Sequence, residues 1–318
     1  MMDYCYQVFG LNFHSDLPLT ELLDSYADLL NTTPDFVIVR GSLQDDWREV
    51  SGQSKNTFLS EGRLLFRIEG TALFEVLDGR TIRYDPEDNV KLDKLRLYLL
   101  GTCMGALLMQ RRTLALHGSC IQIGEKAYAF VGHSGAGKST LANCFMQRGC
   151  LLLSDDVIAL EGYEAGVPIV SPAYPQQKLW QESLQELGLT NDEYRPIFER
   201  EAKYAIPIKN RFKNSPVPLG GIFELVQTDN ETMTLNELNG LHKLGVLHQH
   251  TFRKSLIEGM GLSDWHFQSL TALAASTTVK RLERPGKTAG FTAPLMVDRL
   301  ISKLEKGDVQ QWQQQLMF

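Results

Sequence analysis

The sequence lacks both an excess of basic residues and a long apolar run. Its 318 residues include 32 Lys and Arg against 38 Asp and Glu, a formal net charge of −6. A broad surface for nucleic acid or an anionic membrane needs clustered basic residues, so we expect neither partner. The longest apolar stretch, 97–109, is interrupted by Gly and Thr and is shorter than the roughly 20 residues that span a bilayer.

Cysteines are few and follow no ligand pattern. There are five, and no two of them form a C-x-x-C pair. Disulfide frameworks and zinc sites use even sets of cysteines at recurring spacings, so we expect free, reduced thiols. The opening MMDYCYQVFG has neither the basic nor the long apolar segment of a secretory signal. These absences favour a cytoplasmic protein.

The organisation of the chain changes near residue 90. Apolar and polar residues alternate from 57 to 84, with Asp78-Gly79 as a hairpin signal, and apolar residues then recur at helical spacing. The pattern predicts a β-rich N-terminal domain over 1–90, a buried connecting helix over 91–112 and an α/β domain over 113–318. We also expect strands at 6–9, 36–39 and 221–228 and helices at 262–275 and 293–304.

One segment matches the phosphate-binding pattern G-x-x-x-x-G-K-[ST] at every fixed position. It is GHSGAGKS at 132–139, between an apolar strand pattern and a helical one. Glycines let successive backbone N–H groups point at phosphate oxygens, and the helix N-terminus adds positive potential. Lys138 is expected to reach the β- and γ-phosphates of ATP, and Ser139 to bind Mg²⁺. The predicted nucleotide-binding residues are Gly132, His133, Ser134, Gly135, Ala136, Gly137, Lys138, Ser139 and Thr140.

An acidic pair follows the predicted loop. Asp155 and Asp156 come directly after the apolar run 151–153, and Asp155 is 17 positions beyond Lys138. We expect both carboxylates at the C-terminal end of the next strand, at the edge of a parallel sheet where ligands bind. One carboxylate could hold Mg²⁺ while the other accepts the proton of an attacking hydroxyl. Transporter-type ATPases and small GTPases are disfavoured, since their further motifs are absent.

Four segments together resemble the bacterial HPr kinase/phosphorylase family, which is related in fold to ATP-dependent phosphoenolpyruvate carboxykinase. They are Leu116-His117-Gly118, GHSGAGKST, Arg148-Gly149 and LLLSDDV, within 114–160. The resemblance implies an α/β fold with a P-loop nucleotide-binding core of that type and a β-rich N-terminal domain. Weaker similarities are to the short HPr-kinase-like proteins, such as lasso-peptide precursor kinases. These are YQVFGL, LYLLG, Pro172-Ala173-Tyr174-Pro175 before Leu179-Trp180, and Lys203-Tyr204.

The resemblance implies ATP- and Mg²⁺-dependent phosphorylation of a serine-type hydroxyl on a small protein or peptide. Asp155 would be the catalytic base, Asp156 a metal-side acid beside Ser139, and His117 a neighbour of the transferred phosphate. Lys203 is the favoured second cation at the γ-phosphate. Thr140 stands where HPr kinases usually carry Glu, which disfavours HPr itself as the acceptor.

Several alternatives stay open at this point. Arg211 and Arg253 are less favoured cations, and His248 with His250 lacks the third ligand that a metal site needs. The chain could be a small-molecule kinase or a non-catalytic regulatory protein that binds ATP. HPr kinases assemble as hexamers, so a homo-oligomer is a further alternative.

Overall fold

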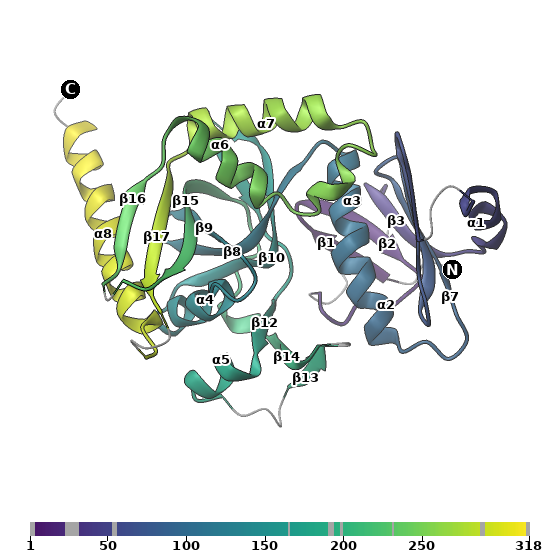
Figure 1. Cartoon of the computed structure of the whole chain (residues 1–318), viewed down its shortest axis with the longest axis horizontal. Helices are drawn as coiled ribbons and strands as arrows, with labels where there is room; N and C mark the ends of the chain where they lie inside the picture. Colours follow the sequence, from purple (N-terminus) through teal and green to yellow (C-terminus); the bar gives the residue numbers. More distant parts are fainter. Residues whose placement is uncertain are drawn as a thin grey trace.

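A computed structural model describes residues 4–22, 32–52, 56–164, 166–189, 194–197, 200–230, 232–286 and 290–315. Within them the chain forms two seven-stranded sheets and one three-stranded sheet. Figure 1 shows the first large sheet beside a helical segment that separates it from the second, while the small sheet lies at the edge of the second. The fold is therefore mixed α/β.

The first sheet has the strand order β1-β2-β3-β7-β6-β5-β4. Hairpins account for most of it, and the alternation between 57 and 84 becomes three consecutive antiparallel pairings. The strands are β1 (Tyr4–Val8), β2 (Leu11–Ser15), β3 (Phe36–Arg40), β4 (Thr57–Ser60), β5 (Arg63–Ile68), β6 (Ala72–Leu77) and β7 (Thr81–Pro86), and the short helix α1 is Gln44–Val50.

The helical segment after the first sheet contains a π-helical turn. It consists of α2 (Leu92–Tyr98), a π-turn at Leu99–Cys103 and α3 (Met104–Gln110). The sequence predicted an uninterrupted helix here. Gly101 and Thr102 of this wider turn line a cavity that is described below, and such turns are frequent at functional sites.

The second sheet has the order β11-β10-β8-β9-β15-β17-β16 and is mixed rather than parallel. Helices α6 and α7 pack on one face and α4 and α8 on the other, as Figure 1 shows. The strands are β8 (Leu114–Ile123), β9 (Lys126–Val131), β10 (Leu151–Glu164), β11 (Val167–Ser171), β15 (Val217–Thr228), β16 (Thr234–Glu237) and β17 (Val279–Pro285). The helices are α4 (Lys138–Gln147), α6 (Gly240–Gln249), α7 (Ser263–Ser276) and α8 (Ala293–Gln315).

The two large sheets share a core. One continuous apolar cluster runs from Phe13 and Phe74 in the first sheet, through Met104 in the helical segment, to Val157 and Ala159 in the second. All five of these side chains are buried. The first sheet therefore packs directly on the second and fixes the helical segment against it.

The third sheet has the order β12-β14-β13 and leads into a short helix. Its strands are β12 (Gln176–Trp180), β13 (Arg195–Ile197) and β14 (Arg200–Pro207), and the helix is α5 (Gln181–Glu186). Strand β12 lies against both α4 and β10. This small sheet therefore forms one side of the region where the predicted loop and acidic pair meet.

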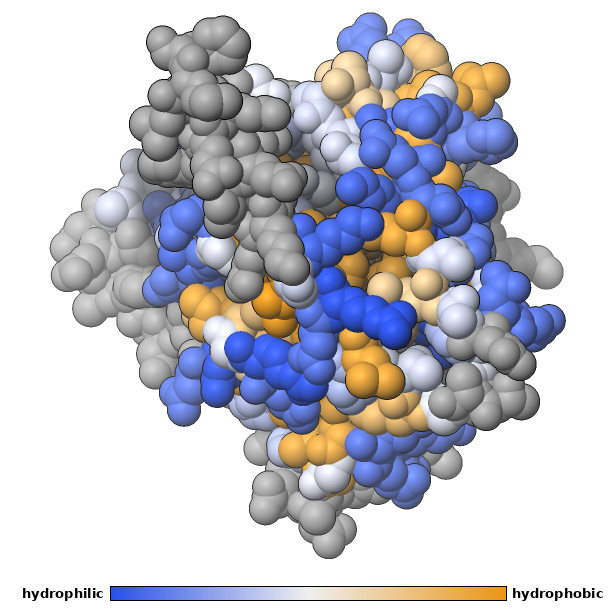
Figure 2. Space-filling model, turned by 90° about the vertical axis from the view of Figure 1, so that its left-hand side faces the viewer, coloured by the Kyte–Doolittle hydropathy of each residue, from blue (hydrophilic) through white to orange (hydrophobic). Residues whose placement is uncertain are grey.

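The cysteines are free thiols, as the sequence predicted. Four of the five are buried. No helix in the described ranges is long and apolar enough to cross a membrane. On the face that carries α8 and β16, apolar residues form separate patches between polar ones (Figure 2).

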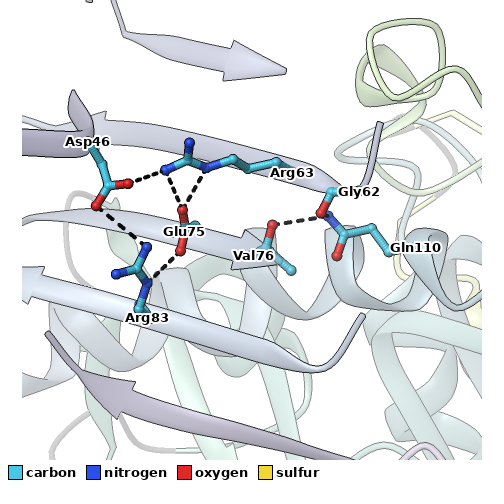
Figure 3. A network of polar contacts seen from close by, with 7 residues as sticks. All are labelled: Asp46, Gly62, Arg63, Glu75, Val76, Arg83 and Gln110. Atoms are coloured by element: carbon cyan, nitrogen blue, oxygen red, sulfur yellow. Dashed lines mark hydrogen bonds and ion pairs between the residues drawn. The ribbon is translucent and has the colours of Figure 1, made fainter. Parts of the chain in front are cut away.

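A buried carboxylate organises the outer side of the first sheet (Figure 3). Glu75 is fully buried and accepts hydrogen bonds from Nε of Arg63 at 2.7 Å and Nε of Arg83 at 2.6 Å. Asp46, on α1, lies 2.6 Å from Arg63 and 3.5 Å from Arg83. Gln110, at the end of α3, donates to the carbonyl oxygens of Gly62 and Val76. The network joins α1 to the sheet, and Gln110 joins the helical segment to it.

We expect Glu75→Gln to lower the free energy of unfolding by at least about 1.5 kcal/mol, since a buried charged acceptor of two guanidinium groups is lost. Glu87→Gln is the matched control, because Glu87 and Arg67 are both exposed and 3.7 Å apart and such pairs contribute about 0–1 kcal/mol. Urea unfolding followed by circular dichroism measures both. Equal midpoints for the two variants would contradict this role of Glu75.

Candidate active site

The predicted phosphate loop joins β9 to α4 and needs its glycines. Gly135 and Gly137 have φ values of 83° and 98°, in the left-handed region, which favours residues without a Cβ. A Cβ on Gly132 would lie 2.6 Å from the carbonyl oxygen of Leu225. Gly137 is the residue just before α4, so the loop leads its N–H groups directly into the helix N-terminus.

Lys138 is folded back over the loop. Its Nζ donates to the carbonyl oxygens of Gly132 at 2.8 Å and of His133 at 3.0 Å. Burial lowers the pKa of this amine, and the nearby Lys203 lowers it further, whereas the Asp155 carboxylate raises it. Within the described ranges, the hydrogen bonds of this buried amine go to two backbone carbonyls, which an anionic group could replace as its partners.

The turn after α4 directs the chain back to the sheet. Gly149, at φ 92°, donates its N–H to the carbonyl of Met146, and Cys150 donates to that of Phe145. These two bonds form a Schellman motif, in which glycine ends the helix. The chain then enters β10, as the sequence predicted.

Strand β8 lies between β10 and β9 and so brings the acidic pair next to the loop. Asp156 pairs with Gly118 on β8, and Gly118 pairs with Val131, the residue before the loop. A Cβ on Gly118 would lie 2.3 Å from the carbonyl oxygen of Phe130, so glycine lets the strands approach closely. The three strands thus place the Asp156 backbone in the same row as the start of the loop.

Two sequence-based expectations about this strand were wrong. The acidic pair does not end it, because β10 continues to Glu164 with apolar residues paired to β8. The local sheet is also not parallel, since antiparallel β8 lies between β9 and β10. The acidic pair lies at an irregularity within the strand rather than at its end. The pairing register breaks between Leu152 and Ser154, and Asp156 has a φ of 118°. A positive φ at a residue other than glycine is strained and is common at functional sites.

Asp155 is buried and held by neutral donors. Its Oδ1 accepts from the hydroxyl of Ser119 at 2.5 Å, and its Oδ2 accepts from the backbone N–H of Lys178 at 2.8 Å. A carboxylate has about four lone-pair sites. Both oxygens therefore keep a free lone pair on a side chain that lines the cavity.

Asp156 is held by charged and titratable partners. Its Oδ2 lies 2.7 Å from Nζ of Lys178, and its Oδ1 lies 3.2 Å from Nδ1 of His117. Burial by itself would raise the pKa of Asp156, but Lys178 and His117 outweigh it and hold the pKa well below its usual range. Burial by itself would lower the pKa of Lys178, but the nearby Asp156 carboxylate outweighs this effect and raises the pKa above its usual value. Asp156 is thus a carboxylate and Lys178 an ammonium at neutral pH.

Sequence reasoning missed Lys178, which lies in a segment quoted only for its resemblance. Its neighbour Gln177 donates to the carbonyl oxygen of Ser139 at 2.8 Å and accepts from Asn143 at 2.9 Å. Consecutive residues of β12 thus bind α4 and the acidic pair. The usable signal was the lysine next to the quoted Leu179-Trp180.

These groups line one cavity of about 1610 Å³. Its wall includes the loop, both acids, His117 and Lys178, together with Lys203 and Arg253. Nζ of Lys203 lies 5.6 Å from the ring centre of Trp180, at the end of β12. Arg211 is not among the lining residues. Of the predicted site residues, the structure thus brings together the two acids, His117, Lys203 and the loop residues other than Ala136, and it leaves Arg211 outside.

Arg284 is a second residue that sequence reasoning missed. From the end of β17 its Nε donates to the carbonyl oxygen of Ala136, within the loop, at 2.8 Å. Burial lowers the pKa of its guanidinium. No motif surrounds it, and only the parallel pairing of β17 with β15 brings it to the loop.

The described ranges contain no cluster of three His, Cys, Asp or Glu side chains that could hold a metal. His250 lies 3.5 Å from Glu224, whereas the His248 ring contacts that of His266, so His248 and His250 diverge. Ser139 and Asp156, the predicted metal residues, both line the cavity. This donor set fits Mg²⁺, which commonly takes one or two protein oxygens, substrate phosphates and water.

No protein-family model matches the chain, and no curated protein matches it. Among solved structures, a match is the HPr(Ser) kinase/phosphatase from Coxiella burnetii, with 15% sequence identity and a TM-score of 0.34. The match covers 61% of this chain and 97% of that one. This similarity is distant and carries no argument, so the function proposed below rests on the geometry of the site.

We expect Lys178→Met to lower the free energy of unfolding by about 3 kcal/mol at pH 7, because a largely buried carboxylate loses its ion-pair partner. Since the folded-state pKa of Asp156 is depressed, the pair stabilises the protein above the unfolded pKa of about 3.9 and loses this effect as pH falls. The difference from wild type should therefore shrink below about pH 4.

Denaturant titrations from pH 7 downward test this expectation. Lys243→Met is the control, because Lys243 on α6 forms no ion pair with the described residues. A Lys178→Met deficit that stays constant down to pH 2 would show that lost packing, not charge, is responsible.

Proposed function

We propose that this protein is an ATP- and Mg²⁺-dependent kinase that transfers the γ-phosphate to a serine hydroxyl of a small protein or peptide. The observation that carries the proposal is that the phosphate loop, both acids, His117 and Lys178 line one cavity. Phosphoryl transfer depends mainly on positioning and charge neutralisation. The cavity supplies a phosphate cradle, cations, metal-binding oxygens and a candidate base.

The loop side of the cavity would hold the triphosphate. Backbone N–H groups of 132–139 and the Lys138 ammonium suit its anionic oxygens. Arg284 is tied to the loop carbonyl of Ala136 and would keep the loop in shape beside the bound phosphates. Bound Mg²⁺ would neutralise developing charge on the phosphate oxygens, with Ser139 and Asp156 as its protein ligands.

The two acids have environments that suit different roles. Asp156 pairs with Lys178, which keeps it ionised, so it fits the metal-side acid. Asp155 accepts its hydrogen bonds from a hydroxyl and a backbone N–H, and both of its oxygens keep a lone pair for an incoming proton. We therefore propose Asp155 as the base that accepts the serine hydroxyl proton.

His117 and two lysines complete the proposed site. The His117 ring is held by Asp156 through both its carboxylate and its backbone carbonyl, which aims it into the cavity beside the transferred phosphate. Lys178 is fixed by the same carboxylate, and Lys203 lies at the rim over Trp180. Fixed cations lower the cost of charge development in the transition state.

Replacing the base should remove transfer and leave nucleotide binding in place. With γ-labelled ATP, Mg²⁺ and a serine peptide library, we expect Asp155→Asn to lower kcat about 10²–10⁴-fold and to change ATP affinity little. Asp264→Asn, on the exposed start of α7, is the matched control. Undiminished transfer by Asp155→Asn would remove Asp155 as the base. Tight ATP binding without transfer by wild type would favour a non-catalytic regulator instead.

Replacing the metal-side acid should change the requirement for Mg²⁺. We expect Asp156→Asn to raise the Mg²⁺ concentration for half-maximal rate at fixed ATP by about tenfold or more, since one of two protein ligands is neutralised. Mg²⁺ titrations of wild type and Asp156→Asn measure it, with Asp264→Asn again as control. An unchanged Mg²⁺ dependence would rule out Asp156 as a metal ligand.

A further inference from the structure

The side of the cavity away from the phosphate loop carries cations that the proposed chemistry does not use. Its wall is formed by Tyr98 and Thr102 of the helical segment and by Arg253 and Lys254. No ion pair joins Arg253 or Lys254 to a carboxylate in the part of the chain that the structure describes. Both are exposed to solvent in the cavity.

The backbone holds Arg253 in a fixed place. The residues before it pair with β8, since Phe252 donates to the carbonyl of Ala115 and His117 donates to that of His250. Arg253 itself has a φ of 53° and precedes a 3₁₀ turn at Lys254–Leu256. An L-residue is uncommon in this left-handed conformation and is retained only where its surroundings determine it.

The segment 250–253 runs from the phosphate loop to helix α3. At one end the His250 ring lies 5.7 Å from that of His133, in the phosphate loop. At the other end, Phe252 packs so closely on Gly105 of α3 that a Cβ there would lie 2.5 Å from its ring. Arg253 therefore lies toward the helical segment and away from the loop that would hold ATP.

Arg253 is nevertheless close to the reacting groups. Its guanidinium carbon lies 5.6 Å from the centre of the Phe252 ring. That ring centre lies 6.0 Å from the centre of the His117 ring, which contacts Asp156. Three successive contacts thus connect the cation to the acidic pair. Their lengths set an upper limit of about 15 Å, the span of four or five residues of extended chain at roughly 3.3 Å each.

We propose that Arg253, with Lys254 beside it, binds a carboxylate of the acceptor, so that the acceptor is an acidic peptide segment. Its Asp or Glu would lie within about five residues of the phosphorylated serine. This inference rests on the proposed kinase function. It adds a specificity-determining contact, since a guanidinium pairs with a carboxylate through two parallel hydrogen bonds.

A positional peptide library with one fixed serine and γ-labelled ATP tests the inference. For wild type we expect Asp or Glu to be selected at one or more positions within about five residues of the serine. In Arg253→Gln, the ratio of kcat/KM for the acidic peptide to kcat/KM for the same peptide with Asn in place of the acid should fall at least about tenfold. Its KM for ATP should be unchanged, and Arg253→Lys should restore part of the preference. Arg299→Gln, on the exposed face of α8, is the matched control.

The outcomes separate the inference from the proposed function. Labelling without acidic preference, or a preference that Arg253→Gln retains, would overturn the inference and leave the kinase function standing. No labelling of any library member by wild type would overturn peptide phosphorylation itself, and the acidic acceptor with it. If small molecules that carry both a hydroxyl and a carboxylate, such as free serine, are labelled and peptides are not, the acceptor is a small molecule and the peptide proposal is wrong.

Discussion

The ion pair between Lys178 and Asp156 is the contact on which the arrangement of this site depends. It joins β12 of the small sheet to β10 of the large one and keeps both groups charged inside the cavity. Gln177, the residue before Lys178, binds the backbone of Ser139 in α4. Removing charge from either member of the pair would therefore weaken the contact between the two strands and leave a poorly solvated charge behind. Positioning and charge are supplied here by the same contact.

Sequence patterns predicted those parts of the fold that depend on local chemistry. The loop at 132–139, the helix ending at Gly149 and the strand that follows it form as expected, because each is specified by glycines or by apolar spacing within a few residues. The prediction of a parallel sheet was wrong because strand pairing depends on long-range contacts. Strand β8 lies between β9 and β10 through pairings that no short-range pattern specifies. Its place depends on tertiary packing, including the close approach at Gly118.

The residues that sequence reasoning missed share this dependence on long-range pairing. Lys178 becomes a partner of Asp156 only because β12 folds against β10, and Arg284 reaches the loop only because β17 pairs with β15. Neither lies in a motif whose spacing implies a role. The acids and the loop lysine could be predicted because they lie close together along the chain, on consecutive elements. The π-turn at 99–103 was also missed, since helical spacing alone does not distinguish it from an α-helical turn.

Charge illustrates how the site differs from the molecule that contains it. The whole chain carries more acidic than basic residues, which disfavours broad anionic surfaces as partners. The lining of the cavity has the opposite balance, with six cations and four carboxylates among the described residues. The cations are Lys138, Lys178, Lys203, Arg253, Lys254 and Arg284, and the acids are Asp155, Asp156, Glu182 and Glu186. Because concave, partly desolvated walls strengthen local fields, this reversal favours a triphosphate in the cavity, and it is consistent with the proposed binding of a second anion by Arg253 and Lys254.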